Sequence, residues 1–184
     1  MIQNNFFVVR HGESENNLLK IDSSKLENKD QFGLSKKGKI ETKIEAKKYT
    51  DFDLIISSPF KRAKETAMIF TKNSQCYVIE NELLSEICVG DFELCKYELS
   101  DAFFEKHNDE SVPYPNGESL LDAKNRAIKC FEQINQTYKN KKILIVTHGW
   151  IVLFLIEYTN KNFDRKKYLK EYDEAREVVE IYRP

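Results

Sequence analysis

The sequence has no excess of charge of either sign and no apolar run long enough to cross a membrane. Lysine and arginine together number 29 and aspartate and glutamate 30, so the formal net charge is −1. This balance provides no broad basic field for nucleic acid or an anionic membrane, but it leaves room for a local anion site. The most apolar stretch, residues 143–156, contains Thr147, His148 and Gly149 and is too short for a transmembrane helix. We therefore expect no nucleic-acid partner and no membrane partner.

Cysteine is also scarce, and no Cys-x-x-Cys motif occurs. The one close pair, Cys88 and Cys95, has no histidine nearby at metal-ligand spacing, so the sequence predicts no structural metal. We expect all four cysteines to be free thiols in a reducing cytoplasm. The first expected strand starts within a few residues of Met1, so we expect no signal peptide. These observations favour a cytoplasmic protein.

Buried strands alternate with helices along the 184 residues, which predicts an α/β fold without internal repeats. The composition, 41% hydrophobic and 32% charged, is that of one globular domain with a substantial core. We expect short strands at residues 6–9, 54–56, 77–79, 143–146 and 178–181. Helices are expected at residues 15–19, 34–49, 59–70, 119–138 and 150–158.

Two of the expected helices carry further information. The helix that Ser35 caps shows a thin apolar stripe at Ile40, Ile44 and Ala46, which predicts its buried face. The next helix is expected to have Ser58 as its N-cap and Pro59 as its first residue. Lys61 and Arg62 then lie in its first turn, where positive charge opposes the helix dipole. Either an anion binds there or these side chains point into water.

The chain is organised around Arg10-His11-Gly12, which ends the first buried strand. Arginine offers planar donors to phosphate, and a histidine can act as a nucleophile or a proton carrier. The strand at residues 143–146 ends in the same way, at Thr147-His148-Gly149. Two unrelated core histidines are the weaker interpretation, because the chain has only three histidines and two occupy equivalent positions at strand ends, where α/β sheets bind ligands. The third, His107, is expected to face solvent.

Two segments lack a sustained hydrophobic period. Residues 20–32 are polar and predict an exposed loop. Residues 83–115 mix acids with aromatic side chains, which indicates a helical or irregular cap over the edge of the sheet. Spacing alone does not choose a catalytic acid among the carboxylates in and next to this cap, which are Glu82, Glu86, Asp91 and Glu93. Glu13 and Glu118 are interpreted as structural.

The chain resembles the histidine phosphatase superfamily, also called phosphoglycerate mutase-like. Six blocks carry the resemblance in the family's order and extend over nearly the whole chain. They are Arg10-His11-Gly12-Glu13-Ser14 with Asn17, Leu34-Ser35-x-x-Gly38, the run from Ser57 to Ala67, Leu83-x-x-Glu86 with Gly90 and Glu93, Asn116-Gly117-Glu118-Ser119, and Val146-Thr147-His148-Gly149. The resemblance implies a three-layer αβα sandwich with a mostly parallel central sheet. It also implies that residues 1–184 form a single domain, with the cap at its carboxyl edge.

The family's mechanism implies a role for each matching residue. His11 attacks phosphorus and becomes a phosphohistidine. Glu86 protonates the leaving oxygen and then helps a water molecule attack. The phosphoryl oxygens are bound by Arg10, Arg62 and His148, with hydrogen bonds from Asn17 and Ser14. The implied reaction is hydrolysis of a small phosphorylated metabolite without a metal or other cofactor.

Some positions depart from the family pattern, and other functions were weighed. The family usually carries a tryptophan where Phe92 stands and a glutamine near Glu41. Many members also have an asparagine before the last strand, where this chain has Glu174-Ala175-Arg176. A cofactor-dependent phosphoglycerate mutase is an alternative, but mutases of the family are longer and have a basic insertion in the cap. A non-catalytic module that binds phosphorylated ligands is a third candidate, which the presence of every catalytic residue type disfavours. The physiological substrate and the oligomeric state stay open.

Overall fold

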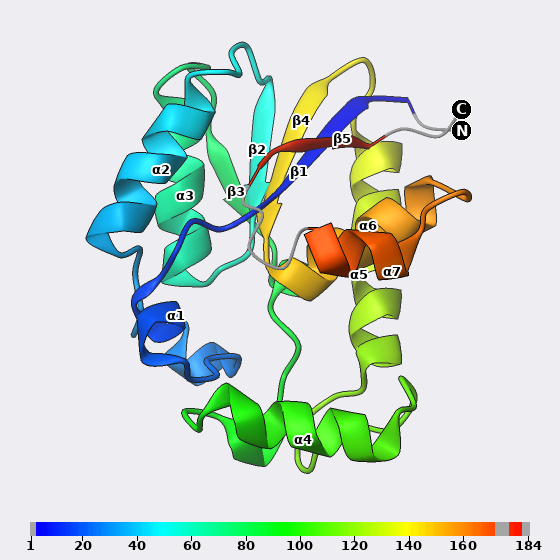
Figure 1. Cartoon of the computed structure of the whole chain (residues 1–184). Helices are drawn as coiled ribbons and strands as arrows, with labels where there is room; N and C mark the ends of the chain where they lie inside the picture. The colour runs from blue at the N-terminus through cyan, green and yellow to red at the C-terminus, as the bar shows by residue number, and fades with distance from the viewer. Residues whose placement is uncertain (1–2, 172–176, 182–184) are drawn as a thin grey trace.

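The computed structural model describes residues 3–171 and 177–181, which form a five-stranded sheet. Its strands are β1 (Asn5–Arg10), β2 (Leu54–Ser57), β3 (Val78–Glu80), β4 (Lys142–Thr147) and β5 (Val179–Ile181). The order is β3-β2-β4-β1-β5, and only β5 runs antiparallel to its neighbour (Figure 1). The expected mostly parallel sheet is confirmed. The central strand β4 and its neighbour β1 are each followed directly by a histidine, His148 and His11.

Helices cover both faces of this sheet and make the three expected layers (Figure 1). On one face lie α2 (Lys36–Ala46) and α3 (Lys61–Thr71), and on the other α5 (Leu120–Thr137) and α6 (Gly149–Thr159). Alternate residues of β1 face opposite layers, since Phe6 and Val8 belong to one buried apolar cluster and Val9 to the other. A further helix, α7 (Arg165–Glu171), precedes β5.

The cap lies beyond the carboxyl ends of the parallel strands (Figure 1). It consists of the 3₁₀ turn η3 (Gly90–Phe92) and helix α4 (Tyr97–His107), preceded by η2 (Glu82–Leu84). The short elements α1 (Glu15–Leu19) and η1 (Leu26–Asn28) lie at the same end of the molecule. Phe92 packs against Phe103 and Tyr114, with ring centroids 5.6 and 6.1 Å away, so it fills an aromatic cluster under the cap. His107 is exposed, as expected.

The expected buried stripe on α2 is wrong at Ile40 and Ile44, which are 59% and 57% exposed, and right only at Ala46, which is buried. The helix instead buries Gly38, Thr42 and Ala46, which share one face at a spacing of four residues. A Cβ at Gly38 would lie 2.0 Å from the carbonyl oxygen of Glu13. Small residues are therefore required where α2 meets the loop that follows β1, and the larger isoleucines turn outward.

Two other local expectations need correction. Helix α3 begins at Lys61 after an N-cap at Phe60, because the hydroxyl of Ser58 contacts His148 instead of starting the helix. The loop at residues 20–32 is not fully exposed. Its residues Ser23, Ser24 and Phe32 are buried. In the part of the chain that the structure describes, no helix combines the length and apolar character of a membrane span. Glu174-Ala175-Arg176 lie outside the described residues.

Candidate active site

His11 lies immediately after β1, and its backbone N–H donates to the carbonyl of Thr147 at the end of β4 over 2.9 Å. Its side chain is only 2% exposed. The ring Nδ1 lies 2.8 Å from the carbonyl oxygen of Gly12. Because a carbonyl oxygen can only accept, Nδ1 carries the proton and Nε2 carries the lone pair. This is the tautomer that a histidine nucleophile at Nε2 requires.

Arg62 joins the two histidines of the strand ends. From the first turn of α3, its Nε donates to His11 Nε2 over 3.1 Å and its Nη2 contacts His148 Nδ1 over 3.3 Å. The same Nη2 donates to the carbonyl of Ser23 over 2.8 Å. Nη1 is buried and has no hydrogen-bond partner among the described residues. Burial lowers the pKa of Arg62 to about 10, so the side chain stays charged at neutral pH and offers a donor to an anion.

His148 presents the opposite ring nitrogen. Its Nε2 lies 2.8 Å from the hydroxyl of Ser58, and its Nδ1 faces Arg62. Because a guanidinium only donates, Nδ1 must accept, and Nε2–H then donates to Ser58. Burial lowers the pKa of His148 well below its usual value, and the charge of Arg62 adds to this effect. His148 is therefore a neutral base.

Glu86 lies beside this pair, between η2 and the cap. Its Oε2 is 3.7 Å from His148 Nδ1, and its Oε1 accepts from the backbone N–H of Ile87 over 3.0 Å. Burial raises the pKa of Glu86, which outweighs the opposing influence of that hydrogen bond and of Arg62. A carboxyl group with a raised pKa holds a proton closer to neutral pH, as a general acid must.

The other acids have different surroundings. The carboxylate of Glu93 accepts from Ser24, Lys25 and Asn28, with Ser24 N–H at 2.7 Å, and so ties the loop at residues 20–32 to the cap. Asp91 binds the amide of Asn116 on the surface at 3.1 Å. Sequence spacing left four candidates for the catalytic acid, and Glu86 is the one whose carboxylate lies close to a histidine of the site.

A half-buried ion pair fixes the backbone that carries Glu86. Arg126, from α5, donates to both carboxylate oxygens of Glu118, at 2.7 and 3.0 Å. It also donates to the carbonyls of Leu83, Ser85 and Glu86 at 2.8 to 2.9 Å. Glu118 is therefore structural, as expected. Arg126 is a positioning residue that the sequence analysis missed, because it lies in an ordinary amphipathic helix with no signal of its own.

The remaining predicted site residues lie around this centre. A Cβ on Gly149 would lie 3.6 Å from Arg10 Nε, so the Arg10 side chain passes the first residue of α6. Ser14 and Asn17 form the capping box of α1, with the Ser14 hydroxyl donating to Asn17 over 2.8 Å. The Asn17 amide donates to the Tyr97 hydroxyl over 2.9 Å. A direct contact of Ser14 or Asn17 with phosphate stays a prediction.

Asp22 is a second residue that sequence reasoning missed. Its carboxylate accepts a hydrogen bond from Ser100 of α4 over 2.7 Å. Burial raises its pKa to about 6, and the negative charge of Glu86 contributes to the rise, so the two acids are within electrostatic reach. The polar loop sequence indicated only solvent exposure, and nothing in it showed that the cap would cover this carboxylate. Within residues 3–171 and 177–181, no three His, Cys, Asp or Glu side chains are grouped to hold a metal ion.

Two histidines and an arginine meet at the carboxyl edge of an αβα sandwich. This arrangement is typical of a phosphoryl-transfer enzyme. The sequence model of the histidine phosphatase superfamily, branch 1, matches residues 6–172. The chain therefore belongs to this superfamily, and it is a phosphatase of that family.

Individual relatives agree with the family. The chain is 33% identical over 144 residues to the "uncharacterized phosphatase PhoE" of Bacillus subtilis, covering 77% of this chain and 70% of that one. It is 34% identical over 107 residues to a metal-independent phosphoserine phosphatase of Arabidopsis thaliana, covering 53% of this chain and 44% of the relative. The solved structure of YhfR from Bacillus stearothermophilus superposes with a TM-score of 0.74 at 25% identity, over 85% of this chain and 79% of that one.

Proposed function

We propose that this protein hydrolyses phosphomonoesters without a metal, through a phosphohistidine intermediate on His11. One observation carries the proposal. The Nδ1–H of His11 is fixed on the carbonyl of Gly12 at 2.8 Å, so the Nε2 lone pair points toward the guanidinium of Arg62. A neutral nucleophile directed at a buried cation is suited to attack on an anion that the cation holds.

In the first step, the Nε2 lone pair of His11 forms a bond to phosphorus while the bond from phosphorus to the ester oxygen breaks. Arg62 Nη1 and Arg10 bind the nonbridging oxygens and stabilise their charge. Glu86, whose pKa burial raises, gives its proton to the departing alkoxide. The products are an alcohol, ionised Glu86 and phosphohistidine.

In the second step, the ionised Glu86 takes a proton from a water molecule as that water attacks phosphorus. The bond from phosphorus to Nε2 breaks, and inorganic phosphate leaves with His11 neutral again. His148 begins as a neutral base, so binding of a doubly charged phosphoryl group favours proton uptake at its Nδ1. The protonated ring then adds a donor for a phosphoryl oxygen.

The substrate is a small phosphorylated metabolite whose remainder is neutral or carries an amine. Asp22, whose pKa is about 6, gives the cap side of the site negative charge at neutral pH, which repels a second acidic group on a substrate unless an amine balances it. The name of the Arabidopsis relative, a metal-independent phosphoserine phosphatase, supports an amine-bearing substrate. We expect O-phosphoserine to exceed 3-phosphoglycerate in kcat/KM, and Asp22→Asn to narrow the difference. A preference for 3-phosphoglycerate contradicts this assignment.

The mechanism is tested by hydrolysis of p-nitrophenyl phosphate with EDTA present. Turnover should continue unchanged in chelator, and acid-labile, alkali-stable phosphate should appear on the protein after rapid quenching. His11→Ala should lose both signals, while circular dichroism verifies its fold. Dependence on added metal, or phosphoenzyme that survives in His11→Ala, contradicts the mechanism.

A parallel assay separates hydrolysis from the mutase alternative. The protein is incubated with 3-phosphoglycerate and 2,3-bisphosphoglycerate, and formation of 2-phosphoglycerate is followed beside release of phosphate. Phosphate release without isomerisation supports the phosphatase. Isomerisation faster than hydrolysis assigns the same site to a mutase.

A further inference from the structure

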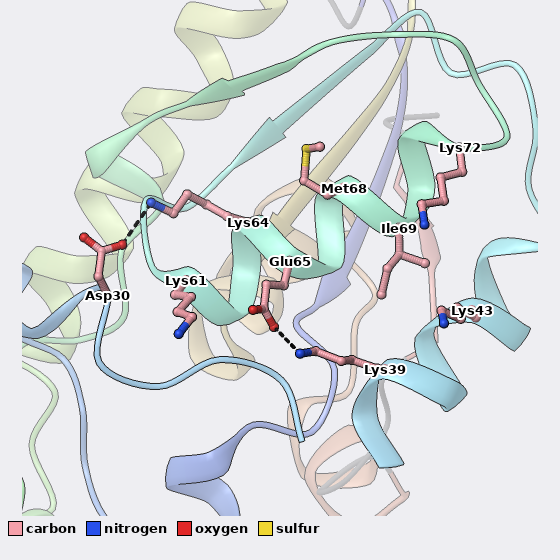
Figure 2. Close-up of a pocket in the computed structure, with 9 residues that line it drawn as sticks. All are labelled: Asp30, Lys39, Lys43, Lys61, Lys64, Glu65, Met68, Ile69 and Lys72. Carbon is pink, nitrogen blue, oxygen red and sulfur yellow. Dashed lines mark hydrogen bonds and ion pairs between the residues drawn. The ribbon is translucent and has the colours of Figure 1, made fainter. Parts of the chain in front are cut away.

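A second, separate cavity lies between α2 and α3, on the outer side of the layer that carries Arg62. It is a groove of about 650 Å³ (Figure 2). Nine residues line it: Asp30, Lys39, Lys43, Lys61, Lys64, Glu65, Met68, Ile69 and Lys72. Five of them are lysines and two are acids, in a protein whose formal net charge is −1. The groove therefore concentrates positive charge that the chain as a whole lacks.

The local acids neutralise only part of this charge. Lys39 lies 3.5 Å from Glu65, and Lys64 lies 3.1 Å from Asp30. Lys43, Lys61 and Lys72 form no ion pair with any of the described residues. Three ammonium groups without a local acid favour occupation by a ligand that brings negative charge.

The two cationic side chains in the first turn of α3, Lys61 and Arg62, point to different sides of the helix. Arg62 turns inward to the histidines, where a phosphoryl group would balance it. Lys61 points toward the outer groove (Figure 2). The expected conflict between Lys61 and the helix dipole is therefore not relieved by the catalytic anion. Lys61 is thus available to a separate ligand that brings negative charge to the groove.

The arrangement of the groove favours an extended ligand over a compact one. Figure 2 shows Lys61 at one end and the pair Lys43 and Lys72 at the other. Lys72 follows Lys61 by eleven positions along α3, which corresponds to about 16 Å. Between them lie Ile69 and Met68, and Met68 is 58% exposed. Cations at both ends with aliphatic side chains between them match a peptide that carries acids on either side of apolar residues.

We propose that the groove between α2 and α3 binds an acidic peptide segment of a partner protein. About five extended residues span the 16 Å between its cationic ends. Acidic side chains at both ends of the segment pair with Lys61 and with Lys43 and Lys72, and a central aliphatic residue covers Met68. This binding site is independent of the catalytic site on the opposite side of α3.

The test uses a fluorescein-labelled peptide, Glu-Glu-Leu-Leu-Glu-Glu, and fluorescence anisotropy at 50 mM salt. We expect saturable binding with a Kd on the order of 0.1 to 1 mM, which weakens at 300 mM salt. Lys43→Glu combined with Lys72→Glu should weaken binding at least about tenfold, because it places like charges against the peptide. Both lysines are exposed, so phosphatase activity should stay unchanged.

A matched control carries the same change in charge elsewhere. Lys129→Glu combined with Lys139→Glu alters two exposed lysines, one on α5 and one after it, across the sheet from the groove. This control should bind the peptide within about twofold of the parent protein. Equal weakening in both double variants, or no saturable binding at 50 mM salt, overturns the proposal. If tripolyphosphate or phosphatidylserine vesicles bind more tightly than the peptide, and Lys43→Glu with Lys72→Glu abolishes that binding, the peptide proposal is overturned. The ligand of the groove is then a compact anion or a membrane surface.

Discussion

His11 and His148 follow neighbouring parallel strands at matched positions, yet they present different nitrogens to the site. Their rings lie 5.2 Å apart and are inclined by 68°. His11 donates from Nδ1 to a backbone carbonyl, whereas His148 donates from Nε2 to the hydroxyl of Ser58. The same pattern of strand, histidine and glycine thus yields two tautomers. Which nitrogen faces the substrate is decided by the partner on the far side of each ring.

The two histidine rings are therefore oriented by different kinds of partner. The partner of His11 is a carbonyl of its own loop, so the nucleophile is fixed wherever the loop is formed. The partner of His148 is a side chain from the loop after β2, so its orientation depends on a distant residue. Arg62 contacts the inward nitrogen of both rings and couples them. Substitutions that remove one ring, the shared cation or one outer partner separate these contributions.

Removing the rings should give the largest effect. His11→Ala is expected to lower kcat for p-nitrophenyl phosphate by about 10⁴-fold or more, because no other group can form the intermediate. His148→Ala is expected to lower it by about 10²- to 10³-fold and to retain detectable phosphoenzyme. Rapid-quench assays of both variants measure this difference. Equal losses, or phosphoenzyme in His11→Ala alone, contradict the assignment of roles.

Removing the shared cation should give the next largest effect. Arg62→Ala leaves the phosphoryl oxygens without the buried donor at Nη1, and we expect kcat/KM to fall about 10²- to 10³-fold. Arg62→Lys keeps the charge but loses the planar set of donors that reaches both rings, so it should recover only a small part. Steady-state kinetics measures both variants. A loss below tenfold for Arg62→Ala would show that Arg10 alone suffices.

Removing the outer partner of His148 should have a smaller effect. Ser58→Ala lets the His148 ring lose its fixed tautomer, and we expect kcat/KM to fall about tenfold. Ser58→Thr keeps the hydroxyl and should recover most of the activity. The pH dependence of kcat/KM distinguishes this role from general damage, since the limb that reports His148 should move in Ser58→Ala and stay in Ser58→Thr. A uniform loss at every pH contradicts a positioning role.

The sequence predicted the parts of the fold that repeat a simple pattern. Four apolar residues before each histidine specified β1 and β4, and the parallel pairing of two such strands brought His11 and His148 together. Ser119 and Asp122 specified the start of α5, where the capping box forms as expected. These features are local, so propensity and periodicity are sufficient to indicate them.

The sequence failed where a contact between distant segments overrides a local preference. Ser58 resembles an N-cap, but its hydroxyl lies within reach of His148, ninety residues later in the chain. Ile40 and Ile44 show a helical stripe, but the close approach of the loop after β1 requires Gly38 on the buried face. Asp22 resembles a loop residue until α4 covers it. The tautomers of the two histidines follow from such contacts and could not be read from spacing.

The smallest effect is expected at Asp22, which contacts neither histidine, and it concerns the free energy of unfolding. The Asp22 pKa is about 6 in the folded protein and 3.8 in the unfolded chain, because burial disfavours the charged form. Between these pH values the folded state binds more protons, so this group lowers stability as pH rises.

Asp22→Asn removes the charge and keeps an acceptor for the Ser100 hydroxyl. We expect a gain of about 1 kcal/mol at pH 8, after allowance for partial exposure, and a smaller gain at pH 5. Urea unfolding of the parent and variant at both pH values measures it. Ser100→Ala is the matched control, because it removes the hydrogen bond and leaves the charge, so it should destabilise most at pH 8. A gain for Asp22→Asn that does not change with pH would show that Asp22 stays ionised in the fold.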